Sequence, residues 1–282
     1  MHLDKTQLKV DGEPTFESRA KKASSLWDSK GSGQGGKKAF GEIRKTLLQM
    51  CVGVEICNYC EHNEATDIEH VYPKKSFPEK AFRWENYILS CGKCNTDYKS
   101  DKFAVFNPLH SADLEELPRQ RGTYSQPANA DGVLINPRWE NPLDYLWLDI
   151  QNKSFHFTDK PGISLRDCRK AKYTIELLGL NARTPLVEGR EVAAKYYLDR
   201  LERYVRAKHA TTFADLEAIT QDPDMVDETQ PFEAEQARIM DAIRSDIAHH
   251  QHPTVWQELK RQRGQLPKTG RLLAQAPEAL EW

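Results

Sequence analysis

The sequence contains no run of eighteen or more apolar residues, so we expect no membrane-spanning helix. Its first residues, Met-His-Leu-Asp-Lys, lack the apolar stretch of a secretory signal peptide, and we therefore expect a cytoplasmic protein. The glycine-rich segment 31–36 is not preceded by a strand pattern, and no Gly-Lys-Ser or Gly-Lys-Thr follows it. This segment therefore lacks the features of a phosphate-binding loop, and we expect it to be a flexible connector.

The sequence also lacks the excess of positive charge that is typical of many nucleic-acid-binding proteins, because its formal net charge is −2. The charges are unevenly distributed: residues 211–250 contain ten Asp and Glu residues but only two Arg residues. Residues 260–271 are basic again. Solvated helix faces explain each of these charge runs, whereas a polyanion would be repelled by the acidic segment.

Apolar residues recur at helical spacing over 14–28 and 37–50, which predicts a helix in each range. Residues 145–150 and 154–157 alternate around a short polar segment and predict a β-hairpin. From about residue 164 onward the pattern is mainly helical. The helices expected in that part cover 184–208, 212–220, 231–249 and 253–263.

Four of the six cysteines stand in two Cys-x-x-Cys pairs, Cys57 with Cys60 and Cys91 with Cys94. Two thiolates of one tight turn can bind the same ion, and two such turns supply the four tetrahedral ligands that structural Zn²⁺ prefers. In a long chain that we expect to be cytosolic, this pattern indicates metal rather than disulfides. His62 is an alternative ligand, and reduced core cysteines or a redox-active pair are the alternative interpretations.

A histidine lies between the two cysteine pairs, within the segment Asp67-Ile-Glu-His-Val-Tyr-Pro-Lys74. The isoleucine, valine and tyrosine favour a strand. His70 has two interpretations. It is either a structural histidine or a fifth zinc-ligand candidate, or it is a general base. Imidazole suits a general base because it titrates near neutral pH and a neighbouring carboxylate can tune it.

The residues that follow favour the general base. Asn86 lies in a second predicted strand that leads to Cys91, and Asn95 follows Cys94 and is expected to begin a short helix. The order is therefore a strand with histidine, a strand with asparagine and a helix with asparagine. In this order and spacing, residues 57–102 resemble the HNH endonuclease family, whose core is a ββα-metal motif and whose members include forms with a zinc-binding Cys-x-x-Cys staple.

The resemblance implies a role for each residue of the pattern. His70 takes a proton from the attacking water, and Asn86 holds and orients the strand that carries it. Glu69, at a position where the family usually has aspartate, binds one catalytic divalent ion, Mg²⁺ or Mn²⁺, with Asn95 as a second ligand and Asp67 as an alternative one. Carboxylate and amide oxygens suit such a hard cation. Four thiolates leave Zn²⁺ no open position, so its role is structural.

Four lysines near this pattern in the sequence are candidates for contact with nucleic-acid phosphates. They are Lys74, Lys75, Lys99 and Lys102. For each of them a plain surface charge is the alternative interpretation. The substrate implied by the resemblance is DNA or RNA, cut to leave 5′-phosphate and 3′-hydroxyl ends.

The flanking sequence extends the resemblance. Its motifs include Trp84-Glu-Asn86, Asn141-Pro-Leu-Asp-Tyr-Leu146 and Thr174-Ile-Glu-Leu-Leu-Gly-Leu-Asn181. Together they are similar to the HNH subunit of Septu-type bacterial antiphage systems, which also occurs beside some retrons. This similarity implies an ABC-class ATPase subunit as partner. The helical, partly acidic C-terminal half is a candidate docking surface, and a self-packed helical bundle is the alternative.

We therefore predict an α+β protein in which a ββα-metal HNH core with a four-cysteine zinc knuckle is embedded in a mainly helical chain. The expected domains are an N-terminal helical arm (1–50), the HNH domain with its knuckle and the following hairpin (51–160), a helical C-terminal domain (161–264) and a flexible tail (265–282). The competing functional hypothesis is a zinc-ribbon adaptor that binds nucleic acid or protein without cutting. A redox sensor that uses Cys-x-x-Cys is a third hypothesis.

Overall fold

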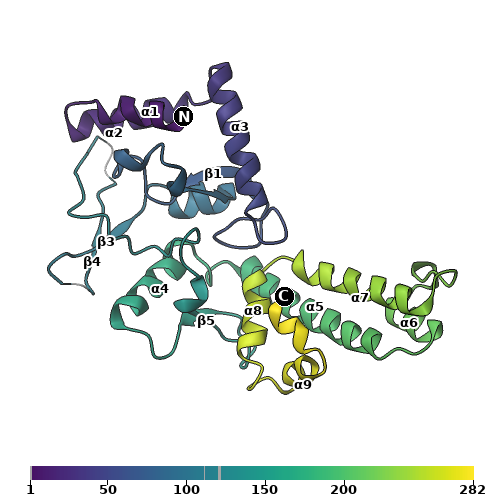
Figure 1. Cartoon of the computed structure of the whole chain (residues 1–282). Helices are drawn as coiled ribbons and strands as arrows, with labels where there is room; N and C mark the ends of the chain where they lie inside the picture. Colours follow the sequence, from purple (N-terminus) through teal and green to yellow (C-terminus); the bar gives the residue numbers. More distant parts are fainter. Residues whose placement is uncertain (1, 111, 120–121) are drawn as a thin grey trace. The chain divides into compact units, whose positions relative to one another are not determined.

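The computed structural model describes residues 2–110, 112–119 and 122–282 of the chain (Figure 1). The chain divides into two compact units that are interleaved in sequence. The first unit comprises Met1–Cys51, Glu55–Trp147 and His156–Thr184, and the second comprises Val52–Val54, Leu148–Phe155 and Pro185–Trp282. No helix among the described residues has the length and apolar character needed to cross a lipid bilayer.

The first unit combines helices with short antiparallel hairpins, which confirms the expected α+β class. Its longer helices are α1 (His2–Asp11), α2 (Phe16–Asp28), α3 (Gln34–Gln49) and α4 (Leu165–Leu177). Its strands are β1 (Asp67–His70), β2 (Tyr87–Ser90), β3 (Ala104–Phe106), β4 (Leu114–Glu116), β5 (Leu146–Leu148, of which Leu148 is assigned to the second unit) and β6 (Phe157–Asp159), and they pair as β1–β2, β3–β4 and β5–β6. Its short helical turns are η1 (Pro78–Lys80), η2 (Trp84–Asn86), η3 (Lys93–Lys99) and η4 (Pro142–Asp144).

The β1–β2 hairpin and η3 form the two strands and the helix of the predicted core. In the antiparallel register His70 is opposite Tyr87, and Asp67 is opposite Ser90. Asn86 lies in the η2 turn immediately before β2 rather than inside the strand. η3 is a single π-helical segment that begins two residues before Asn95, so the expected helix is present with an earlier start.

The N-terminal helices are not a separate arm, and the expected domain boundary near residue 50 is corrected here. Phe40, Ile43 and Leu47 of α3 recur at intervals of three and four residues, and they join Tyr87 and Leu89 of β2 in one buried cluster. Because this helix face packs directly on the hairpin, residues 1–51 belong to the same compact unit as the HNH core.

The glycine-rich segment is also more ordered than the expected flexible connector. Gly35 and Gly36 lie in the first turn of α3, which begins at Gln34. A Cβ atom at position 36 would lie 2.1 Å from the carbonyl oxygen of Lys30, a distance that no side chain tolerates. The glycine is therefore required by the close approach of two backbone segments.

The boundary expected near residue 160 is also corrected, because α4 belongs to the first unit. Thr174 of α4 accepts a hydrogen bond from the backbone nitrogen of Ile135 at 3.0 Å, and Tyr173 packs against the buried residues Ala104, Phe106 and Val133. The predicted hairpin is present as β5–β6, but its second strand begins at Phe157 because Lys153 and Phe155 have positive φ angles and extend the turn.

The second unit is helical. Its elements are α5 (Thr184–Lys208), α6 (Phe213–Thr220), η5 (Pro223–Met225), α7 (Phe232–Ala248), α8 (Pro253–Arg261), α9 (Pro267–Gln275) and η6 (Pro277–Glu281). The four expected helices are therefore found, with boundaries shifted by at most two residues. Ile239, Ile243 and Ile247, spaced four residues apart on α7, are buried and supply one side of its core.

The expected flexible tail over 265–282 is wrong. The segment forms α9 and η6, and Leu272 and Leu273 are buried. The indole Nε1 of Trp256 donates a hydrogen bond to the carbonyl oxygen of Trp282 at 3.2 Å. Lys208 and Glu278 add an ion pair at 2.8 Å. Apolar burial and these polar contacts hold the end of the chain in place.

Candidate active site and metal centre

The four paired cysteines come together as a candidate metal centre. Their Sγ atoms all lie within 4.8 Å of one another, all four residues are buried, and none forms a disulfide. Four sulfurs around one Zn²⁺ at Zn–S distances of about 2.3 Å would be about 3.8 Å apart. The observed Cys60–Cys91 separation of 4.0 Å is close to that value, so the donor set and its spacing fit a zinc knuckle.

Arg183 is a contact of this centre that the sequence pattern did not reveal. Its Nη1 lies 3.2 Å from Cys94 Sγ, its side chain is nearly buried, and its guanidinium stacks over the ring of Tyr98. Asn63 Nδ2 donates to Cys91 Sγ at 3.5 Å from the other side. Four thiolates around a divalent ion carry a net charge of −2, which the guanidinium partly offsets. Such partners orient metal ligands and raise metal affinity.

Three of the four predicted catalytic residues line one small hollow, which we call the catalytic hollow. Its volume is about 250 Å³, and Glu69, His70 and Asn95 all line it together with Lys74 and Lys99. β1 supplies the first two residues and η3 supplies Asn95 and Lys99. Because Cys91 directly follows β2 and Cys94 lies inside η3, the knuckle fixes the hairpin and the helix relative to each other.

The imidazole of His70 is held in one orientation and kept neutral. Its Nε2 lies 2.7 Å from the carbonyl oxygen of Ala81, which can only accept, so Nε2 carries the proton and Nδ1 keeps a lone pair. The ring packs against Trp27 of α2 and Tyr87 of β2, with centroid distances of 4.0 and 5.3 Å. Burial lowers the pKa of His70 to about 3, and the nearby charge of Lys74 adds to this effect. The base form therefore predominates at neutral pH.

Gln7 of α1 supports His70 indirectly. Its Nε2 donates to the carbonyl oxygen of Pro78 at 3.0 Å, and its Oε1 accepts from the backbone nitrogen of Phe82 at 2.8 Å. These two contacts lie on either side of Ala81 in the sequence. The carbonyl oxygen of Ala81 accepts hydrogen bonds from His70 Nε2 and from the hydroxyl of Tyr87. Gln7 and Phe82 are 75 residues apart, so no local sequence pattern signals this contact.

Glu69 forms a buried ion pair with Lys99. The Lys99 Nζ atom lies 2.6 Å from Glu69 Oε1, and the two side chains are only 1% and 7% exposed. The same ammonium donates to the carbonyl oxygen of His70 at 2.8 Å. Within the described residues, Oε1 accepts no well-directed hydrogen bond. A buried carboxylate oxygen whose only partner is a cation has the chemistry of a divalent-ion ligand, and in this structure that cation is the Lys99 ammonium.

The two asparagines have different environments. Asn86 does not line the hollow: its Oδ1 accepts from the backbone nitrogen of Tyr72 at 2.8 Å, and its Nδ2 donates to the carbonyl oxygens of Tyr72 and Lys80. These bonds fix the chain just after β1. Asn95 lines the hollow and donates from Nδ2 to Asp67 Oδ2 at 3.0 Å. The carbonyl oxygen of the same amide is therefore available as a ligand for a metal ion.

The four candidate phosphate-binding lysines separate in the structure. Lys74 lines the catalytic hollow, and Lys102 lines a different hollow. Lys75 pairs with Asp101 at the surface at 2.5 Å. The expectation for Lys99 is corrected, because a side chain that is 1% exposed and paired with a buried carboxylate cannot act as a surface contact for phosphate.

Comparison with known proteins places the HNH resemblance on the same residues. Residues 57–101 match the family model described as HNH endonuclease, so the chain contains an HNH endonuclease domain in this range. A Septu protein PtuB of Bacillus thuringiensis is 32% identical over 84 residues, which cover 27% of this chain and 32% of that protein. A Septu protein PtuB of Bacillus mycoides (strain KBAB4) is 23% identical over 178 residues, which cover 57% of this chain and 54% of that protein.

This chain therefore spans about a third and about half of the lengths of these two relatives. No solved structure matches the chain significantly. The relatives support the Septu-type resemblance of the flanking sequence, and the family model supports the HNH pattern of the core.

Proposed function

We propose that this chain is a metal-dependent endonuclease that hydrolyses phosphodiester bonds of nucleic acid. The observation that carries the proposal is the catalytic hollow, where a neutral buried imidazole, a carboxylate and an amide line about 250 Å³ of space. These are the groups that metal-assisted phosphodiester hydrolysis needs. The HNH family match over residues 57–101 supports the same chemistry.

His70 is the general base of the proposed reaction. Its Nε2–H bond to Ala81 leaves the Nδ1 lone pair as the proton acceptor. Nδ1 takes a proton from water, the water oxygen forms a bond to phosphorus, and the bond from phosphorus to the 3′ oxygen breaks. The 3′ oxygen takes a proton from solvent water and His70 returns its own to solvent, so the products carry 5′-phosphate and 3′-hydroxyl ends. Trp27, Tyr87 and Ala81 act by keeping the ring in position.

Glu69 and Asn95 are the proposed ligands of the catalytic ion, Mg²⁺ or Mn²⁺. Such an ion, when bound, stabilises negative charge on the phosphate and on the leaving oxygen. Asp67 acts through Asn95, because its carboxylate accepts the amide hydrogen and so directs the amide carbonyl away from itself. Lys74 supplies a further positive charge at the hollow.

Zn²⁺ at the four cysteines is the proposed structural ion. Its ligands come from the turn before the hairpin and from the start of η3, so the ion joins the elements that carry Glu69 and Asn95. Metal binding of this kind contributes directly to folding. Zinc with four thiolate ligands has no open position for water or phosphate and takes no part in the reaction.

The proposed setting is a bacterial antiphage complex of the Septu type, in which an ABC-class ATPase subunit controls the nuclease. Support comes from the flanking motifs and from the two relatives, both named Septu protein PtuB. The helical second unit offers the additional surface that docking to such a subunit requires.

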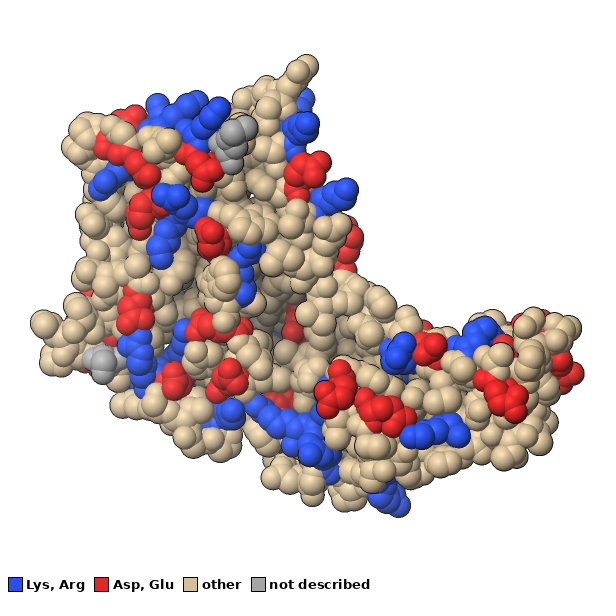
Figure 2. Space-filling model, viewed as in Figure 1, with Lys and Arg blue, Asp and Glu red and all other residues tan. Residues whose placement is uncertain are grey.

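On the face shown in Figure 2, basic and acidic side chains are interspersed rather than gathered in one basic patch. This face therefore does not offer the broad basic surface that binds duplex by charge alone.

The adaptor hypothesis needs the zinc knuckle but not the catalytic hollow. An adaptor has no use for a buried imidazole with a directed lone pair beside a buried carboxylate. Substitution of His70 therefore separates the two functions: an adaptor keeps its binding, whereas a nuclease loses its activity.

The proposal is tested with purified wild type, His70→Ala and the control His209→Ala, whose histidine is an exposed residue of the second unit. Each protein is incubated with plasmid DNA and total RNA in Mg²⁺ or Mn²⁺, with and without the ATPase encoded beside it. Cleavage by wild type and His209→Ala but not by His70→Ala is the expected result. Cleavage that survives His70→Ala, or no cleavage by folded, zinc-loaded wild type under any condition, overturns the proposal.

A further inference from the structure

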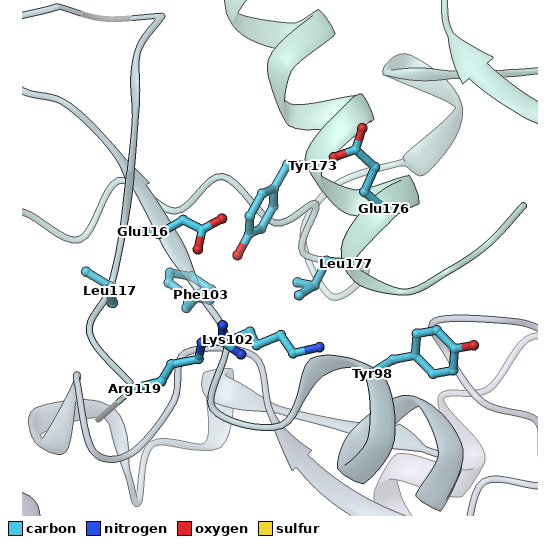
Figure 3. Close-up of a pocket in the computed structure, with 9 residues that line it drawn as sticks. All are labelled: Tyr98, Lys102, Phe103, Glu116, Leu117, Arg119, Tyr173, Glu176 and Leu177. Atoms are coloured by element: carbon cyan, nitrogen blue, oxygen red, sulfur yellow. The ribbon is translucent and has the colours of Figure 1, made fainter. Parts of the chain in front are cut away.

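The first unit contains a second hollow that the proposed reaction does not use. It has a volume of about 400 Å³, within the usual range for small-molecule sites, and lies between the 98–103 segment, β4 and α4 (Figure 3). We call it the base hollow. Tyr173, Glu116 and Lys102 point toward its centre in Figure 3. An aromatic ring, a carboxylate and an ammonium thus face one space.

The charged groups of the base hollow are not used by the protein itself. Among the described residues, Glu116, Lys102 and Arg119 form no ion pair and no side-chain hydrogen bond. Tyr173 is half-buried, and its hydroxyl has no hydrogen-bond partner in the described part of the chain. Burial raises the pKa of Tyr173 well above its ordinary value, with Glu116 adding to the rise and Arg119 opposing it. Glu116 and Arg119 therefore both lie close enough to Tyr173 to act on it electrostatically, while all four groups remain available to a ligand.

Shared walls connect the base hollow to the catalytic hollow. Asp101 lines the catalytic hollow and also an intermediate hollow of about 410 Å³. Arg119 lines that intermediate hollow and also the base hollow. A strand whose scissile phosphate lies at His70 could therefore extend along these walls to the base hollow.

We propose that the base hollow receives one unstacked nucleobase of the substrate strand. The base packs against the Tyr173 ring, Glu116 accepts a hydrogen bond from its exocyclic amine, and Lys102 and Arg119 contact the adjoining phosphates. The inference rests on the proposed function, because it takes the strand at His70 to be nucleic acid.

The carboxylate of Glu116 predicts which bases bind well. A carboxylate can only accept, and the amine of cytosine donates to it. Thymine and uracil are of similar size, but they present a carbonyl oxygen at the same position and are rejected. The hollow therefore favours cytosine over thymine or uracil in single-stranded or locally opened nucleic acid. Stacking supplies affinity for any base, and the hydrogen bond supplies the preference.

The test measures binding rather than cleavage, so it does not depend on catalysis. Labelled oligo(dC), oligo(dT), oligo(rC) and oligo(rU) are titrated with the His70→Ala protein and followed by fluorescence anisotropy at fixed salt. We expect the cytosine polymers to bind about 5- to 10-fold more tightly than their partners, which is within the range of a typical net hydrogen bond. Adding Glu116→Gln should abolish this ratio, because an amide can also donate to a carbonyl oxygen.

Glu115→Gln is the matched control, because this substitution removes the same charge from β4. Glu115 is exposed and does not line the base hollow. The substitution should leave the ratio unchanged. Tyr173→Ala should weaken all four polymers on the order of 5- to 150-fold, and Tyr173→Phe, which keeps the ring and the fold, should not. Equal binding of cytosine and thymine polymers, a ratio that survives Glu116→Gln, or no binding at all overturns the inference.

The outcomes distinguish this inference from the proposed function. Base preference that depends on Glu116, in a protein whose His70-intact form cuts nothing, supports the base hollow and rejects the nuclease. Cleavage that depends on His70, without any dependence of binding on Glu116 or Tyr173, supports the nuclease and rejects the base hollow.

Discussion

Replacement of Lys99 by methionine should lower the free energy of unfolding, because it leaves the buried carboxylate of Glu69 at the catalytic hollow without its partner. Methionine keeps most of the side-chain volume but removes the ammonium that lies 2.6 Å from Glu69. Breaking a buried ion pair in this way typically costs about 3–5 kcal/mol, because the remaining charge stays buried without a partner. Glu69 can limit the loss by taking up a proton in the folded state.

The protonation of Glu69 gives this prediction a pH dependence. Burial already raises the pKa of Glu69 above its ordinary value of 4.5, and loss of Lys99 raises it further. Between 4.5 and the folded-state pKa, the folded protein keeps a proton that the unfolded chain releases, so stability falls as pH rises. Keeping that proton at pH 7 costs about 3 kcal/mol, and at pH 5 less than about 1 kcal/mol. The variant should therefore be much closer to wild type at pH 5.

Lys93→Met is the matched control on the same helical segment. Lys93 pairs with Asp97 at 2.8 Å, but both side chains are more than half exposed, so its loss should cost only about 0–0.5 kcal/mol. Urea unfolding at pH 5 and pH 7 measures both variants. Mg²⁺ should stabilise Lys99→Met more than wild type, because no ammonium competes for Glu69. Equal stability of the two variants at pH 7 would refute the assignment of a buried, charged pair.

Other contacts give further predictions. Arg183→Gln should weaken zinc binding by about 10- to 100-fold, whereas substitution of the exposed Arg169 by Gln should not. The assay follows transfer of zinc to a coloured chelator. Equal release rates for the two variants would contradict a role of Arg183 in zinc binding. Gln7→Leu leaves two buried backbone groups unpaired and should lower the free energy of unfolding, measured with urea, by about 2–4 kcal/mol. It should also lower kcat more than it changes KM. An unchanged kcat would argue against a role of Gln7 in positioning His70. Gly36→Ala should destabilise the protein in thermal melts, whereas Gly41→Ala, with open space around its Cβ, should stabilise it by about 0.5–1 kcal/mol; the reverse order would contradict the packing of α3.

The residues of the core could be identified from the sequence because their signals are local. Each Cys-x-x-Cys pair is formed by one turn, and His70 and Asn95 stand at short, regular distances from those pairs. The structure brings the four cysteines within 4.8 Å of one another and places Glu69 and His70 with Asn95 at one hollow. Local patterns also predicted the hairpin and the helices of the second unit.

The supporting contacts could not be predicted because they join segments that are far apart in the sequence. Arg183 and Cys94 are 89 residues apart, and Gln7 and Phe82 are 75 residues apart. In the sequence, nothing distinguishes Lys99 from a surface lysine. Only the folded arrangement shows that its side chain is buried against Glu69. The tail after residue 265 was misjudged for the same reason, since its order comes from packing on distant helices rather than from its own pattern.

The measurement that tests the central claim most directly is cleavage by the zinc-loaded protein with and without the His70 imidazole. Wild type and His70→Ala, matched for zinc content and melting temperature, are incubated with DNA and RNA in Mg²⁺ or Mn²⁺, alone and with the proposed ATPase partner. We predict divalent-ion-dependent products with 5′-phosphate ends for wild type and none for His70→Ala. Equal cleavage by both proteins, or products formed equally well in EDTA, would contradict the account.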